Sequence, residues 1–226
     1  MKTIFNCLSM LVISAASVFA QTGKPSAGFL RVVHLVAPGE GTLRVKLDGE
    51  ALFPRGYELG QRTGGIGLPP GAHLLELSKN GVEPVKEKLD LPPGETITVL
   101  AYAEKLPPKR EGEPPRWAIK LRKLPVATSD EGYRLSLISF CDREEVLVRT
   151  FIETKRKTET TPLKRFQTSE IDLGRGRGGV EIRLENQALA AVSLDEPGRY
   201  LVVLYEDAKG EVRAFSFYDP KLEVAG

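Results

Sequence analysis

Apolar and polar residues alternate along most of this chain. In the stretch TLRVKL, Leu43, Val45 and Leu47 share one face, and the residues between them are charged. The stretches WAIKLR (residues 117–122) and VEIRLE (residues 180–185) follow the same pattern. A period of two is typical of half-buried antiparallel strands, because successive side chains of a strand point to opposite faces. The pattern therefore predicts an all-β protein.

Turn sequences separate the predicted strands at short intervals. Asn80-Gly81 stands between two apolar stretches and predicts a hairpin turn. Leu-Pro-Pro-Gly occurs twice, at residues 68–71 and 91–94. Proline fixes the chain direction and glycine takes a conformation that other residues resist, so each copy is predicted to begin a core strand. The stretch NQALAAVSL (residues 186–194) is the best candidate for a short helix, and it fits an irregular strand as well.

The chain also repeats at the level of a domain. Residues 30–36 correspond to residues 133–139 at an offset of 103, Gly94 to Gly198 at 104, and Arg116 to Arg213 at 97. The last offset is smaller because the first half has the longer loop, EKLPPKREGEPP against EDAKGE. We therefore expect two tandem immunoglobulin-like antiparallel β-sandwich domains that arose by internal duplication, over residues 27–125 and 131–220.

Residues 105–115, rich in proline, lysine and glutamate, have the composition of an interdomain linker. The repeat instead places them in a long hairpin loop of the first domain, and it places the junction at residues 125–132. The loop is stiffened by prolines and is one candidate contact surface for a protein partner.

The first twenty residues have the three parts of a secretory signal peptide. Lys2 supplies a positive charge, an apolar stretch follows over residues 8–18, and Val18 and Ala20 are small residues at the expected cleavage site. We expect residues 1–20 to be removed near Ala20 and the protein to be exported, to the periplasm or outside the cell. A lipid anchor on Cys7 is a weaker alternative, because no pair of small residues precedes it.

Cysteine and charge content exclude several classes of protein. Cys141 is the only cysteine after cleavage, so no intramolecular disulfide can form. Its apolar surroundings predict a buried small hydrophobe rather than a nucleophile. The 32 basic and 30 acidic residues nearly balance, so no basic excess favours a nucleic-acid partner.

Four features of the first half occur together: Arg31-Val32-Val33-His34, a Leu47-Asp48-Gly49 hairpin and the two Leu-Pro-Pro-Gly turns. In this combination, residues 28 to about 103 resemble an uncharacterised family of secreted bacterial modules, domain of unknown function 4397. The stretch LVAPGEG replaces the acidic segment usual after the histidine, and the second half keeps only the strand rhythm and the final turn. The resemblance implies a β-sandwich at a bacterial cell envelope and carries no catalytic residues.

The residues that usually carry chemistry are scarce. His34 and His73 are the only histidines, and each alternates onto an apolar face, which predicts structural roles. Trp117 stands on the apolar face of its strand and is predicted to belong to the core. No motif for a nucleophile, metal or cofactor is present. We expect a protein without catalytic residues, metal or cofactor.

Two glycine-rich stretches combine glycines with arginines, LGQRTGGIGL (residues 59–68) and LGRGRGGVEI (residues 173–182). Backbone N–H groups beside Arg62, Arg175 and Arg177 are a candidate site for a glycan or an anion. Strands rather than helices follow the glycines, however, and glycine also serves bulges and tight corners. Turn geometry is therefore the competing interpretation.

The sequence favours a non-enzymatic structural or interaction module of the cell envelope that binds a protein partner through strand edges or loops. Glycan or anion binding at the arginine–glycine loops is the alternative, and a hydrolase is a third. An edge strand unprotected by charge or proline would favour strand addition. One surface joining the arginine–glycine loops would favour the anion site, and an interdomain groove with two facing carboxylates would favour an enzyme.

Overall fold

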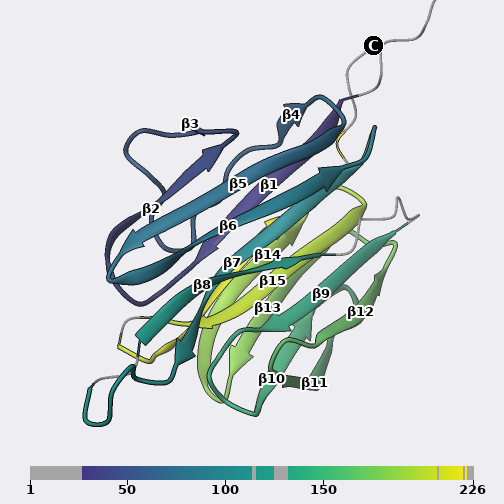
Figure 1. Cartoon of the computed structure of the whole chain (residues 1–226). Coiled ribbons are helices and arrows are strands. Elements are labelled where there is room, and N and C mark those ends of the chain that lie inside the picture. Colours follow the sequence, from purple (N-terminus) through teal and green to yellow (C-terminus); the bar gives the residue numbers. More distant parts are fainter. Residues whose placement is uncertain (1–26, 114–115, 125–131, 208, 221, 223–226) are drawn as a thin grey trace, which may run out of the picture.

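The computed structural model describes residues 27–113, 116–124, 132–207, 209–220 and 222 (Figure 1). Strands make up nearly all the regular structure, and one 3-10 turn is the single helical element of the described residues. The prediction of an all-β protein is confirmed. The predicted signal peptide and most of the predicted junction, residues 125–131, lie outside the described residues.

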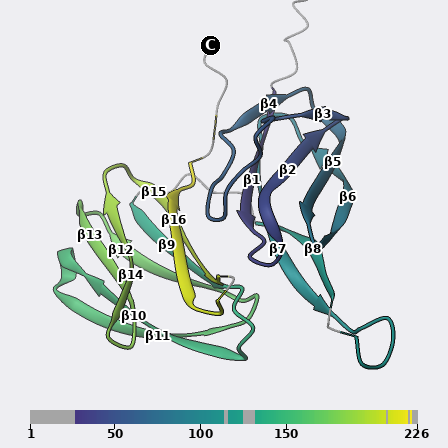
Figure 2. The ribbon, with the colours of Figure 1, turned by 90° about the vertical axis from the view of Figure 1, so that its left-hand side faces the viewer.

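The first half forms a sheet of eight strands that are hydrogen-bonded in the order β3-β2-β5-β6-β8-β7-β1-β4. Its two ends fold over each other as a sandwich, joined where β6 pairs with β8 (Figure 2). The strands are β1 (Gly28–Leu35), β2 (Glu40–Leu47), β3 (Glu50–Ala51), β4 (Ile66–Leu68), β5 (Gly71–Asn80), β6 (Val82–Leu91), β7 (Thr96–Leu106) and β8 (Arg116–Lys123).

The second half forms two four-stranded sheets, in the orders β11-β10-β13-β14 and β12-β9-β15-β16. The strands are β9 (Tyr133–Ser139), β10 (Glu145–Ile152), β11 (Lys157–Lys164), β12 (Thr168–Gly174), β13 (Gly178–Leu184), β14 (Gln187–Leu194), β15 (Gly198–Glu206) and β16 (Val212–Tyr218), with the 3-10 turn η1 at Glu153–Lys155. Adding eight to each strand number of the first half reproduces this order. The correspondence adds support to the predicted duplication, which stays a prediction, as does the immunoglobulin-like assignment.

The correspondence between the halves differs in register from the sequence repeat. At the end of β1 the Val36 N–H donates to His34 Nδ1, and at the end of β9 the Cys141 N–H donates to Ser139 Oγ. These matching bonds align His34 with Ser139, an offset of 105 instead of 103. A shift of two residues preserves the alternation of faces, so the apolar pattern could not distinguish the two registers.

Turn residues occupy the positions that the sequence predicted. β5 and β6 form a hairpin around Asn80-Gly81, and Gly81 has a φ of 77°. Gly71 opens β5 with a φ of 130°, and Gly94 precedes β7 with a φ of 71°. The first Leu-Pro-Pro-Gly turn is held further by His73, whose ring bonds to the Pro69 carbonyl at 2.8 Å and to Asp48 at 2.7 Å.

The long loop after β7, described for residues 107–113, leads to β8, and the antiparallel ladder of β7 and β8 extends to the pair Leu106–Arg116. The loop therefore belongs to a hairpin of the first half, as the repeat predicted, and does not link the halves.

Each half has its own core between its sheets. The first core contains Leu30, Val32, Leu43, Val45, Leu75, Leu77, Leu89, Val99 and Ile119, among others. The second contains Leu135, Leu137, Cys141, Val146, Val148, Leu163, Ile182, Val192 and Val202, among others. Cys141 is fully buried, and burial raises the pKa of its thiol. The prediction of a buried small hydrophobe is confirmed for this cysteine.

A third apolar cluster joins the two halves. Val33, Leu35, Leu100 and Leu124 of the first half pack with residues of the second half, namely Ile138, Phe140, Leu201, Val203 and Phe217. The strands β1, β7, β9 and β15 are therefore buried on both faces, which tandem domains in loose contact would not show (Figure 2). Both cores and this interface cluster stack in one continuous series of layers.

A buried charge cluster lies beside the interface cluster. Asp219, which follows β16, binds Arg31 of β1 and accepts a hydrogen bond from Thr98 of β7 at 3.0 Å. Arg199 of its own half donates to the other carboxylate oxygen through Nε at 3.1 Å. Arg31 and Asp219 are only 2 % and 1 % exposed. Burial lowers the pKa of Arg31, and the attraction of Asp219 acts in the opposite direction.

We predict that Asp219→Ala lowers the free energy of unfolding by about 3–5 kcal/mol, because it leaves Arg31 buried without its counter-charge. Urea unfolding monitored by circular dichroism measures the change. Asp195→Ala, at an exposed aspartate of the second half, is the matched control and should cost less than about 1 kcal/mol. Equal losses in the two variants would contradict a structural role for the buried cluster.

His34 is buried in the first core at 1 % exposure. Its Nδ1 accepts from the Val36 N–H at 3.1 Å, and its Nε2 has no hydrogen-bond partner among the described residues. Burial, reinforced by the charge of nearby Lys79, lowers the pKa of His34 to about 3. The neutral ring is therefore part of the core, as predicted for a structural histidine.

This burial makes stability depend on pH. An unfolded histidine binds a proton below about pH 6.5, whereas folded His34 does not until about pH 3. The stabilisation that comes from burying the neutral His34 ring is present above pH 6.5 and is lost as the pH falls from 6.5 toward 3. When the pH falls from 7 to 5, the free energy of unfolding of the parent protein should drop by about 2 kcal/mol more than that of the His34→Gln variant.

Urea unfolding at the two pH values measures this difference, and His73→Gln is the control of opposite sign. The hydrogen bond and charge of Asp48 and the Pro69 carbonyl raise the pKa of His73, so this histidine stabilises the fold more as the pH falls. The free energy of unfolding of the His73→Gln variant should therefore fall more steeply with decreasing pH than that of the parent protein. An identical pH dependence in the protein and in His34→Gln would refute the role of His34.

Candidate functional site

β14 is an open edge of the second half. It pairs with β13 on one side and is the last strand of its sheet. Its sequence, QALAAVSL, contains neither a charged residue nor proline. Of the described strands that end a sheet, β3 and β4 are only two and three residues long, and β11, β12 and β16 carry charged residues or proline. β14 therefore lacks the features that usually protect an edge.

The sequence of β14 was compatible with both a short helix and an irregular strand. The structure shows a strand with one register shift against β13. Val192 and Leu194 alternate into the second core, while Ala191 and Ser193 are exposed. Alanine favours helices, but the pairing with β13 and the burial of these two side chains determine the strand.

The corresponding place in the first half is closed. There β6 and β8 pair at Glu83 and Ala118, and Arg116 forms an ion pair with Glu83. In the second half β14 approaches β16, yet no ladder joins them among the described residues. The second sandwich therefore keeps an open seam between its two sheets.

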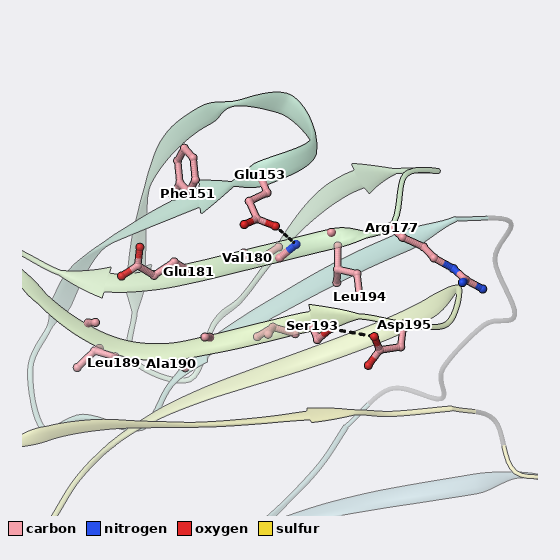
Figure 3. Close-up of a pocket in the computed structure, with 15 residues that line it drawn as sticks. Phe151, Glu153, Arg177, Val180, Glu181, Leu189, Ala190, Ser193, Leu194 and Asp195 are labelled. Carbon is pink, nitrogen blue, oxygen red and sulfur yellow. Dashed lines mark hydrogen bonds between the residues drawn. The ribbon is translucent and has the colours of Figure 1, made fainter.

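A hollow of about 880 Å³ covers the outer face of β13 and β14, and we call it the outer hollow. Phe151, Glu181 and Ala191 lie in one row across the strands that border it. Figure 3 shows Arg177 at one end of the hollow and Leu189 and Ala190 toward the other. Small residues of both strands and the loop before β13 make up part of its lining: Gly178, Gly179, Ala188, Ala190 and Ala191.

A second hollow, of about 380 Å³, lies in the open seam, and we call it the seam hollow. It is lined by Ala191, Val192 and Ser193 of β14 and, on the other side, by Tyr200, Ser216 and Tyr218 of β15 and β16. The outer and seam hollows share residues 191–193 and 195. The edge of β14 thus has one hollow on each side of its sheet.

This arrangement suits an added strand. An extended segment paired with β14 would form backbone hydrogen bonds along the edge. Its alternate side chains would point to opposite faces of the sheet, one set toward the outer hollow and the other toward the seam hollow.

The three predicted arginines have different surroundings in the structure. The guanidinium of Arg62 lies over the ring of Phe217, 5.0 Å from its centre, beside the interface between the halves. Arg177 lines the outer hollow, and Arg175 lies near Gly132 at the start of the second half. Arg62 does not line the outer hollow with Arg177, and the anion site stays a prediction.

The glycines of the second loop have a packing role. A Cβ on Gly179 would lie 2.8 Å from the Glu153 carboxylate, and one on Gly178 would lie 2.8 Å from the Thr154 methyl group. The Gly179 N–H donates to Glu153 at 2.6 Å (Figure 3). This backbone group is therefore already bound to a carboxylate. Glu153, Glu181 and Asp195 line the outer hollow against the single Arg177, a balance that disfavours an anion.

Carboxylates of the second half do lie in a groove between the halves, the feature that would favour an enzyme. Each of them is held by an arginine: Asp142 by Arg165, Glu206 by Arg143 and Asp207 by Arg213. The described residues contain no cluster of three histidine, cysteine or acidic side chains that could hold a metal ion. Within the same part of the chain, no helix has the length and apolar character to cross a membrane.

No protein-family model matches the chain, and no curated protein matches it. The resemblance of the first half to domain of unknown function 4397 therefore stays a prediction.

We predict that Arg175→Ala combined with Arg177→Ala leaves the retention of the protein on heparin-agarose unchanged. The carboxylates around Arg177 already oppose the approach of a sulfated glycan. The measurement is the salt concentration at which each protein elutes. Elution of the double variant at a clearly lower salt concentration would restore the anion site.

Proposed function

We propose that this protein is an exported, non-enzymatic interaction module of the cell envelope that binds a partner protein by strand addition at β14. Export rests on the N-terminal pattern of Lys2, the apolar stretch and Ala20. Strand addition rests on the edge itself. The partner contributes one extended segment, and the rigid sandwich supplies the template.

The observation that carries this proposal is the pair of hollows on either side of an unprotected edge. Backbone pairing alone gives affinity with little selectivity, because every strand offers the same N–H and C=O groups. The outer hollow accepts side chains over small residues, while the seam hollow presents the rings of Tyr200 and Tyr218. A segment with apolar or aromatic side chains at alternate positions fits both.

The experiment is site-specific crosslinking in cells of the source organism. A photoreactive amino acid at Ala191, an exposed position of β14, should give a discrete adduct with a partner protein. Ser193→Lys adds a charge beside it without touching the core and should reduce the adduct at least about tenfold. The melting temperature of this variant should stay within about 2 °C of that of the parent protein.

Thr160, an exposed residue of β11 at the opposite edge of the same sheet, provides the control. The photoreactive amino acid at Thr160 should give no such adduct, and Thr160→Lys should leave the adduct formed from position 191 unchanged. Adducts of equal yield from both positions would refute binding at β14. An adduct between two copies of the chain would refute a separate partner.

A further inference from the structure

A groove of about 350 Å³ lies between the two halves, at the end of the interface cluster. Pro38, Ala103 and Trp117 line it from the first half. The second half contributes Phe140, Asp142, Arg165, Glu206 and Asp207. The groove continues past Asp142 and Arg165 into a hollow of about 380 Å³ beside Lys105 and the following prolines. Concave sites of this size at a domain interface commonly hold small ligands.

The groove has an apolar wall made of aromatic rings. Trp117 packs against the first core and also lines the groove. Phe140 is held in place by Tyr102 and Phe166, at ring-centre distances of 4.8 and 5.5 Å. These contacts come from both halves, so the wall is rigid as long as the halves stay packed together.

The three carboxylates that line the groove are each paired with an arginine: Arg165 within the groove, and Arg143 and Arg213 beside it. Arg165 donates to Asp142 Oδ1 at 3.0 Å, and Arg143 donates to Glu206 at 3.3 Å. Asp207 accepts from Arg213 at 3.0 Å and from two backbone N–H groups of the following turn. A cationic ligand would therefore meet the arginines, and an anionic ligand would meet the carboxylates.

Hydrogen-bonding capacity remains on Asp142 and Arg165, which line the groove. The Arg165 Nε is enclosed and out of reach of a ligand, but the side chain is 28 % exposed, and within the described residues only its Nη1 donates, to Asp142. Asp142 uses Oδ1 for Arg165, its side chain is about half exposed, and within the described part of the chain its Oδ2 accepts no hydrogen bond. The second Asp142 oxygen is thus an acceptor, and the Nη groups of Arg165 are donors, on a pair that its own hydrogen bond holds together.

We propose that this groove binds a neutral saccharide. A pyranose ring has a face of C–H groups that packs on an aromatic ring, and its hydroxyl groups both donate and accept hydrogen bonds. Trp117 and Phe140 supply the aromatic wall, and Asp142 with Arg165 supplies an acceptor and a donor for neighbouring hydroxyls. The site is independent of β14 and of the arginine–glycine loops.

Trp117 is the only tryptophan of the chain, so intrinsic fluorescence reports on the groove directly. The full chain is titrated with chitotriose, cellotriose, maltotriose and mannotriose, with sorbitol as the control for viscosity. At least one trisaccharide should shift the Trp117 emission in a saturable manner. Asp142→Asn should weaken that binding at least about tenfold, and Arg165→Gln should weaken it as well.

Asp195→Asn is the matched control, because it makes the same change at an exposed aspartate that does not line the groove. It should leave the affinity unchanged, and circular dichroism shows whether each variant keeps its fold. The absence of a saturable shift with every trisaccharide up to about 10 mM would overturn the proposal. An unchanged affinity in Asp142→Asn would also overturn the proposal. So would a fluorescence response to spermine alone, or to a sulfated trisaccharide alone, because the proposed ligand is neutral.

Discussion

The burial of Asp219 against Arg31 and Thr98 fixes how the two halves of this protein lie against each other. Asp219 directly follows β16, whereas Arg31 and Thr98 belong to β1 and β7, so their bonds can form only when the two halves are in contact. Removal of a charged pair from water is costly, but a buried charge without its partner costs more. The cluster therefore favours the one arrangement of the halves in which Arg31 and Asp219 meet. The apolar interface cluster supplies the favourable burial.

This arrangement determines which surfaces stay available. β1, β7, β9 and β15 cover one another, so they contribute backbone and side chains to the interior. The outer sheet of the second half ends at β14, and residues of both halves line the groove at Trp117. The groove therefore depends on the packing of the halves, whereas the β14 edge is open because no ladder joins β14 to β16 among the described residues.

Much of the fold followed from local patterns. Strands such as β2 and β13 alternate apolar and polar residues and were predicted from their sequences. The apolar runs in β1 and β15 are apolar on both faces, a pattern that indicates double burial but does not say what covers the second face. Asp219 gave no local sign of its role, because Arg31 lies 188 positions earlier in the chain.

The candidate site was harder to predict than the fold. The alanines of β14 suit a helix, and only its pairing with β13 and the burial of Val192 and Leu194 show that it is an edge strand. Conversely, the composition of the second arginine–glycine loop suggested a binding site. In the structure its glycines are needed because Glu153 and Thr154 lie too close for a Cβ atom. The same residue types, glycine and arginine, occur in tight backbone packing and in ligand sites. Only the contacts in the folded structure show which of the two applies.

The contrast between the closed β6–β8 seam and the open β14 edge has a consequence for assembly. Growth of a fibre by strand addition needs two free edges per molecule, so that each added copy exposes a new one. The described strands offer one such edge of useful length without charge or proline. A strand that adds there becomes the new edge of the sheet, and copies of this chain have no second edge of this kind among their described strands. Strand addition through β14 would therefore give a complex of defined size rather than a fibre built from copies of this chain.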